Sequence, residues 1–135
     1  MDFHGVKVAI IVEGKLLMHL RDNKPGLFNA NRWDFPGGGR EGTETPPECA
    51  IRETEEEFGI VLKPEAFVWE KLYPAQKDPN QKAYFMVAKM SLLEIKGIHL
   101  TEGQAWQLFD IKNFFEDEAV IDALKNRFRD YLENE

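Results

Sequence analysis

The segment from Gly38 to Ile60 constrains the fold of this chain more than any other part of it. It reads GGREGTETPPECAIRETEEEFGI. The stretch Thr45-Pro46-Pro47-Glu48 has the layout of a capping box with proline in the first helical turn, and Gly59 suits the left-handed residue that ends a helix. We therefore predict a helix from about Pro46 to Phe58, with a loop on each side of it.

The predicted helix carries three carboxylates on adjacent turns: Glu53, Glu56 and Glu57. At about 100° per residue they fall on one face of the helix, and the apolar residues fall on the other. Such like charges destabilise a helix unless a cation lies among them. An acidic run alone is more often a solvated surface, but the glycines and the arginine at fixed offsets favour a site. Carboxylate oxygens are hard ligands, so we expect Mg²⁺, with Mn²⁺ able to substitute.

The charge of the chain is concentrated in the same region. The formal net charge of the 135 residues is -7, and residues 41–57 hold seven Glu and one Arg. This balance argues against stable nucleic-acid binding, and no apolar run is long enough for a membrane span. A single cysteine, Cys49, allows no intrachain disulfide and fits a reducing compartment. We expect one soluble, cytoplasmic domain over residues 1–135.

The remaining sequence predicts a mixed α/β protein. Val6–Val12 and Lys15–Leu20 flank a Glu-Gly turn and predict a hairpin in the middle of a sheet. A polar loop follows, and then three glycines that leave the backbone free to approach a ligand. Further strands are expected at 33–35, 61–63, 67–72, 83–90 and 106–109, and an amphipathic helix from Glu118 onward.

The spacing from Gly38 to Ile60 resembles the signature of the Nudix hydrolases. It follows G-x5-E-x7-R-E-U-x-E-E-x-G-U, where U is a bulky apolar residue, and only Thr54 departs from it. The run WDFPGG at 33–38 is similar to the strand that leads into this box in the MutT-like branch. The resemblance implies an α/β/α sandwich with a mixed β-sheet, in which the box forms a catalytic loop-helix-loop.

Roles for individual residues follow from the resemblance alone. It implies that Glu53, Glu56 and Glu57 ligate Mg²⁺, with the Gly38 carbonyl and Glu102 as further ligands. Arg52 would orient the carboxylates, and Glu44 and Gly59 would support the box. Glu102, in a Glu-Gly-Gln loop, is one candidate for the general base, and Glu56 is the other.

The implied activity is pyrophosphohydrolysis of a nucleoside di- or triphosphate derivative by metal-assisted attack of water. An oxidised nucleotide such as 8-oxo-dGTP, a nucleoside diphosphate sugar and a dinucleoside polyphosphate all stay open as substrates, and so does a homodimer. Arg21 and Lys24 are candidate phosphate contacts, and Phe28 is a candidate stacking surface. Asp117 stands where the MutT-like branch has a purine-reading asparagine, which puts the base preference in question. The alternative is a non-catalytic Nudix-like binding or regulatory domain.

Overall fold

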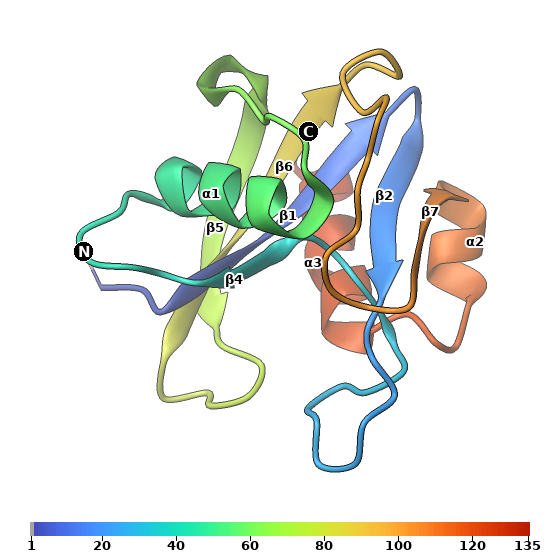
Figure 1. Ribbon diagram of the computed structural model, residues 1–135. Helices are drawn as coiled ribbons and strands as arrows, with labels where there is room; N and C mark the ends of the chain where they lie inside the picture. The colour runs from blue at the N-terminus through green and yellow to red at the C-terminus, as the bar shows by residue number, and fades with distance from the viewer. Residues whose placement is uncertain (1) are drawn as a thin grey trace.

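A single mixed sheet forms the centre of the molecule. The computed structural model describes residues 2–135 (Figure 1). The sheet has seven strands in the order β3-β2-β1-β6-β5, with β4 pairing β1 and β7 pairing β2. The strands are β1 Gly5–Val12, β2 Lys15–Leu20, β3 Trp33–Asp34, β4 Gly37–Gly39, β5 Phe67–Pro74, β6 Lys82–Met90 and β7 Ala105–Asp110. The helices are α1 Pro46–Phe58, α2 Ile111–Glu116 and α3 Asp122–Glu133, with a 3-10 turn, η1, at Pro64–Ala66.

The two faces of the sheet are covered by different helices, so the fold is the expected α/β/α sandwich. Alternate residues of β1 point to opposite faces. Val6, Val8 and Ile10 pack in one core cluster with Cys49, Ala50 and Phe58 of α1. Ala9 belongs to the other cluster, together with Phe114 of α2 and Phe128 of α3. Strands β1 and β6 pair in parallel and the other pairs are antiparallel, which confirms the mixed sheet.

The predicted hairpin and central helix are confirmed. Strands β1 and β2 pair next to each other in the middle of the sheet. The Thr45 hydroxyl accepts a hydrogen bond from the Glu48 amide at 3.3 Å, and the Glu48 carboxylate accepts one from the Thr45 amide at 2.8 Å. Gly59 ends the helix with a φ of 68°. The helix therefore has the bounds that its capping residues predicted.

Two predictions about extended segments were wrong. Residues 61–63 do not form a strand, and η1 begins directly afterwards at Pro64. The glycines at 37–39 form strand β4 instead of a free loop, paired with Gly5 to Lys7 of β1. Position 37 needs a glycine, because a Cβ there would overlap the backbone of Val6 and Lys7.

The C-terminal helix also differs from its predicted bounds. It begins at Asp122, and the separate helix α2 precedes it. Between them the Asp117 carboxylate accepts a hydrogen bond from the Ala119 amide at 2.8 Å, which stabilises a turn at this point. No helix of residues 2–135 is long and apolar enough to cross a membrane.

Candidate active site

Strand β4 and helix α1 lie against each other at the start of the site. The Glu53 carboxylate lies directly over Gly38, so closely that a Cβ at position 38 would overlap it. The Cys49 thiol lies 3.9 Å from the Gly38 carbonyl oxygen on the same side of the strand. A side chain at position 38 would therefore displace the Glu53 carboxylate from this place.

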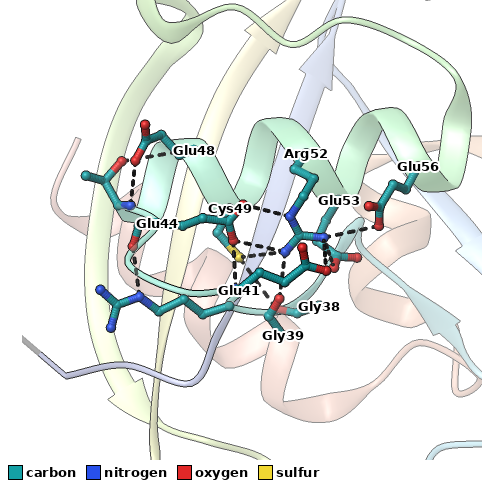
Figure 2. Close-up of polar contacts among 11 residues, drawn as sticks. Gly38, Gly39, Glu41, Glu44, Glu48, Cys49, Arg52, Glu53 and Glu56 are labelled. Carbon is teal, nitrogen blue, oxygen red and sulfur yellow. Dashed lines mark hydrogen bonds and ion pairs between the residues drawn. The ribbon is translucent and has the colours of Figure 1, made fainter.

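Arg52 holds the carboxylates of the site together (Figure 2). Its Nε and Nη2 atoms donate to the two oxygens of Glu44 at 2.7 and 3.0 Å. Its Nη1 atom donates to Glu53 at 2.8 Å and to Glu56 at 3.1 Å. The Nη2 atom also donates to the Gly39 carbonyl at 2.8 Å. One guanidinium thus joins the loop, strand β4 and two glutamates of α1.

These contacts fix the protonation of the pair at the centre of the network. The hydrogen bonds from Arg52 lower the pKa of Glu44 to about 2. Those same hydrogen bonds, with the ones to Glu53, raise the pKa of Arg52 above its usual value. Glu44 and Arg52 therefore stay ionised at every physiological pH, and Glu44 acts on the site through Arg52.

We predicted from helix geometry that Glu53, Glu56 and Glu57 share one face of α1, away from the core, but the three side chains differ in burial. Glu56 is exposed, whereas only 6% of Glu57 is exposed. Glu57 faces the sheet, where its carboxylate accepts a hydrogen bond from the Gly37 amide at 2.8 Å. Burial raises the pKa of Glu57 to about 8 and also raises the pKa of Glu53. The site therefore holds carboxyl groups of graded proton affinity.

His19 is a residue of this site to which the sequence analysis gave no role. Its Nε2 atom lies 3.8 Å from the Glu57 carboxylate, and its ring packs edge-on against Phe58. Burial lowers the pKa of His19 to about 4, so the ring is neutral at pH 7. The alternation of β2 could have revealed it, because Leu17 and His19 fall on the face that packs against α1.

The oxygen ligands at this site fit a hard divalent cation. Glu53 and Glu56 offer carboxylate oxygens on one side of the helix, and the Glu53 carboxylate lies against Gly38 of β4. No group of three or more His, Cys, Asp or Glu side chains within residues 2–135 is gathered around a metal-sized centre. The Arg52 guanidinium supplies the positive charge between Glu53 and Glu56 in this arrangement. The chemistry of the ligand set, rather than a preformed cage, supports metal binding.

The loop that carries Glu102 is fixed beside the end of α1. The Thr101 amide donates to the Glu57 carbonyl at 3.0 Å, and the Thr101 hydroxyl donates to the Glu56 carbonyl. On its other side, the Gln104 amide donates to the Leu20 carbonyl at 2.8 Å. The Glu102 side chain is exposed. The structure therefore brings Glu102 to the end of the helix that carries Glu56 and Glu57.

A cavity of about 390 Å³ opens next to β4. It is lined by residues of the sheet, of the segment before β1, of the loop after β2, of the loop after β5 and of α3: His4, Gly5, Val6, Lys7, Arg21, Phe28, Asn29, Asp34, Gly38, Gly39, Ala75, Gln76, Lys77, Ala83 and Arg127. Arg21 and Phe28 are thus brought to the cavity. Lys24, which pairs with Asp22, and Asp117, in the turn before α3, do not line it.

A buried ion-pair cluster lies at the wall of this cavity. The Asp34 carboxylate accepts hydrogen bonds from Lys7 at 2.8 Å and from Arg21 at 3.2 Å. Burial alone would raise the pKa of Asp34, but the two cations keep it below its usual value. Lys7 and Asp34 had no predicted role, because nothing in the sequence shows that residues 7 and 34 are neighbours across the sheet.

Comparisons with known proteins support the fold. A family model described as the NUDIX domain matches residues 3–130. A structure of a MutT protein from Methanosarcina mazei Go1 is 20% identical with a TM-score of 0.77, covering 98% of this chain and 95% of that one.

Two further solved structures have similar folds. A bifunctional NMN adenylyltransferase/ADP ribose pyrophosphatase from Francisella tularensis, complexed with AMP and a Mn ion, is 22% identical with a TM-score of 0.76. The match covers 99% of this chain and 42% of that protein. A C. elegans Ap4A hydrolase is 20% identical with a TM-score of 0.69, covering 97% of this chain and 99% of that one. At these identities the likeness is one of fold.

Proposed function

This chain belongs to the Nudix family of hydrolases, which act on pyrophosphate bonds, and we propose that it is a Mg²⁺-dependent pyrophosphohydrolase of nucleoside diphosphate derivatives. The observation that carries the proposal is the contact of Arg52 with Glu44, Glu53 and Glu56 beside the carbonyls of β4. An acidic surface that only contacts solvent needs neither the bidentate Arg52–Glu44 pair nor a glycine under Glu53. Mn²⁺ is expected to substitute for Mg²⁺.

We assign the metal ligands to Glu53, Glu56 and Glu57 and to the Gly38 carbonyl, with Glu102 as a further candidate. When bound, the cation neutralises phosphate charge and lowers the pKa of a coordinated water. Arg52 and Glu44 orient the glutamates, and Gly59 ends the helix at the point where the Glu102 loop contacts it. Glu57 retains its proton near neutral pH until a cation displaces it, because its burial disfavours the charged form.

The proton of the attacking water requires a base within hydrogen-bond reach. Glu102 and Glu56 are our two candidates, since both are exposed and lie at the same end of α1. A Glu102→Gln variant that loses turnover while keeping its Mg²⁺ dependence would favour Glu102. A larger loss in Glu56→Gln, at saturating Mg²⁺, would favour Glu56.

Substrate binding is assigned to the cavity beside β4. Lys7 and Arg21 present cations to phosphate oxygens, and Phe28 offers an exposed ring against which a base can stack. The proposed contacts of Lys24 and Asp117 lie outside the lining of this cavity. The names of the similar structures span MutT, ADP ribose pyrophosphatase and Ap4A hydrolase, so modified nucleoside triphosphates, nucleotide sugars and dinucleoside polyphosphates all stay candidates.

We also propose that residues 1–135 act as one domain, because both core clusters are built on the same sheet. A homodimer stays a proposal that size-exclusion chromatography with light scattering would test.

A panel of nucleoside diphosphate derivatives with Mg²⁺, followed by phosphorus NMR, tests the function. We expect at least one member to be cleaved at a phosphoanhydride bond, with no cleavage in EDTA. Nucleotide binding without cleavage of any member would instead support the non-catalytic alternative.

A further inference from the structure

Arg127 of α3 is a buried cation that the proposed reaction does not use. Only 7% of the residue is exposed. Its Nη2 atom donates to the Pro74 carbonyl at 2.7 Å, and its guanidinium lies 4.8 Å from the centre of the Tyr73 ring. The side chain is therefore held at the end of β5, on the lining of the cavity.

No carboxylate neutralises Arg127 within residues 2–135. The nearby acidic group is Asp130, one turn further along α3, and it is engaged elsewhere. It accepts a hydrogen bond from the Tyr73 hydroxyl at 2.8 Å and lies 3.8 Å from the Lys71 ammonium. A guanidinium has five N–H donors, and a carbonyl uses one of them. Because a buried charge without an opposite charge is costly, a ligand anion is the partner that the site lacks.

The cavity around Arg127 is basic although the chain carries a net charge of -7. Its lining includes Lys7, Arg21, Lys77 and Arg127 against one carboxylate, Asp34. The Asp34 carboxylate is already shared by Lys7 and Arg21. Two cations against one carboxylate leave positive charge at Lys7 and Arg21, and no salt bridge neutralises Lys77 or Arg127 within residues 2–135, so the Arg127 end of the cavity also attracts an anionic group.

The strand against which Arg127 packs, β5, is three strands away from β4, which contacts the carboxylates of α1. In the sheet, Gly39 of β4 pairs with Gly5, Gly5 with Ala83, and Ala83 with Tyr73. Three strand spacings separate Gly39 from Tyr73, which is roughly 14 Å. A diphosphate held at α1 cannot reach this far by itself, so the group at Arg127 must be another part of the same ligand.

We propose that Arg127 binds a phosphate ester that the substrate carries in addition to its scissile diphosphate. This assignment rests on the proposed function, and it narrows the substrate class to phosphorylated nucleoside diphosphate derivatives. The guanidinium forms charge-assisted hydrogen bonds to the ester oxygens, and the Tyr73 ring keeps the guanidinium plane in place.

Two matched pairs of probes test the proposal: NADP⁺ against NAD⁺, and coenzyme A against dephospho-coenzyme A. The members of each pair share a diphosphate and differ by one ribose phosphate. With Mg²⁺, we expect kcat/KM to be higher by roughly tenfold or more for the phosphorylated member of at least one pair, carried mainly by KM. Arg127→Gln should abolish this preference. Arg127→Lys keeps the charge but lacks the planar guanidinium, so this variant should retain part of the preference for the phosphorylated probe.

Arg129→Gln is the matched control. Arg129 lies two residues further on the same helix, against Phe115 and outside the cavity lining. The Arg129→Gln substitution removes the same charge as Arg127→Gln. Because Arg129 does not line the cavity, this variant should keep the preference for the phosphorylated probe. Equal kcat/KM for both members of each pair in the wild type, or the same preference in Arg127→Gln as in Arg129→Gln, would overturn the proposal. If Arg127→Gln does not fold, Arg127→Lys is compared with Arg129→Gln instead. A preference in Arg127→Lys as large as that of the wild type would then overturn the proposal.

Calorimetric binding of the same probes in EDTA separates this proposal from the reaction. Tighter binding of the phosphorylated member that depends on Arg127 supports the anion site even if no probe is hydrolysed, in which case only the proposed function is in doubt. Hydrolysis of the probes with no phosphate preference in either kinetics or binding would leave the proposed function standing and reject the role of Arg127. Failure of every probe to bind the wild type would also reject it.

Discussion

Arg52 and Glu44 form a bidentate ion pair across the boundary between the loop and helix α1. Both hydrogen bonds from the guanidinium are short, since Nε lies 2.7 Å and Nη2 lies 3.0 Å from the two carboxylate oxygens of Glu44. The pair leaves Nη1 for Glu53 and Glu56. Glu44 therefore fixes the rotation of the guanidinium, and the guanidinium fixes the spacing of the two glutamates that we assign to the metal.

Replacing Arg52 by lysine keeps the charge but removes the planar fork that these contacts need. We expect the apparent Mg²⁺ affinity or the turnover to fall by roughly 10- to 100-fold, as for other residues that orient metal ligands. Titration of activity with Mg²⁺ measures the change. Arg129→Lys, on the exposed side of α3, is the control and should match the wild type. An unchanged Mg²⁺ titration in Arg52→Lys would contradict this role.

Gly38→Ala should damage the site because the new methyl group would overlap the Glu53 carboxylate. The carboxylate is the far end of a flexible side chain, so it can move aside with little loss of stability, but it then leaves its place beside Arg52. Mg²⁺ titration should therefore show weaker binding in Gly38→Ala. Gly39→Ala is the control, since a Cβ there lies 3.8 Å from its nearest neighbour, the His4 carbonyl oxygen. Equal Mg²⁺ affinity of the two variants would be evidence against the close contact of Gly38 with Glu53.

Asp34→Asn should destabilise the protein, because Lys7 and Arg21 would lose the buried carboxylate that they share. Breaking a buried ion pair typically costs about 3–5 kcal/mol. Asp110→Asn removes an exposed partner of Lys15 at 3.6 Å and should cost less than about 1 kcal/mol. Denaturant unfolding of both variants makes the comparison. A loss no larger in Asp34→Asn than in Asp110→Asn would refute a structural role for the buried cluster.

The metal-free protein should lose stability as the pH rises from 6.5 to 8. Burial raises the pKa of Glu57 to about 8 from its usual 4.5, so the folded protein holds a proton that the unfolded chain has released. The stability from this proton is fully present below pH 4.5 and is lost as the pH approaches 8. The opposite effect of His19, whose pKa burial lowers to about 4 from 6.5, acts only below pH 6.5.

Denaturant unfolding in EDTA across this interval should therefore show a decline on the order of 1 kcal/mol per pH unit. Glu57→Gln should remove the decline, because glutamine does not titrate. Glu55→Gln, an exposed neighbour on the same helix, should keep it. A decline of the same size in Glu57→Gln would show that another group is responsible.

Local signals predicted the parts of the fold that depend on local structure. The capping box at Thr45 and the left-handed Gly59 gave both ends of α1, because these residues satisfy the helix ends themselves. The run Val6–Val12 before a Glu-Gly turn predicted a strand, and β1 is that strand. The glycines of β4 were misread, because a glycine required by a close neighbour looks the same in sequence as one required by a flexible loop.

The site was predictable where its residues lie close together in the sequence. Arg52, Glu53 and Glu56 meet within one helix, and Glu44 precedes them by one loop. The buried state of Glu57 depends on the amide of Gly37 and the ring of His19, which only the pairing of strands brings together. The same holds for Lys7 with Asp34, and for Arg127 with Pro74. Spacing along one helix cannot report contacts that cross the sheet.

The central claim, a metal-dependent reaction carried by the glutamates of α1, is tested most directly by Glu56→Gln beside Glu55→Gln. The two changes remove the same charge from adjacent residues, and only Glu56 contacts Arg52. We measure phosphate or pyrophosphate release against Mg²⁺ concentration on a substrate that the panel identifies. Glu56→Gln should lower Mg²⁺-dependent turnover by roughly 100-fold or more while unfolding at the same denaturant concentration as the wild type. Equal turnover in Glu56→Gln and the wild type would contradict the account.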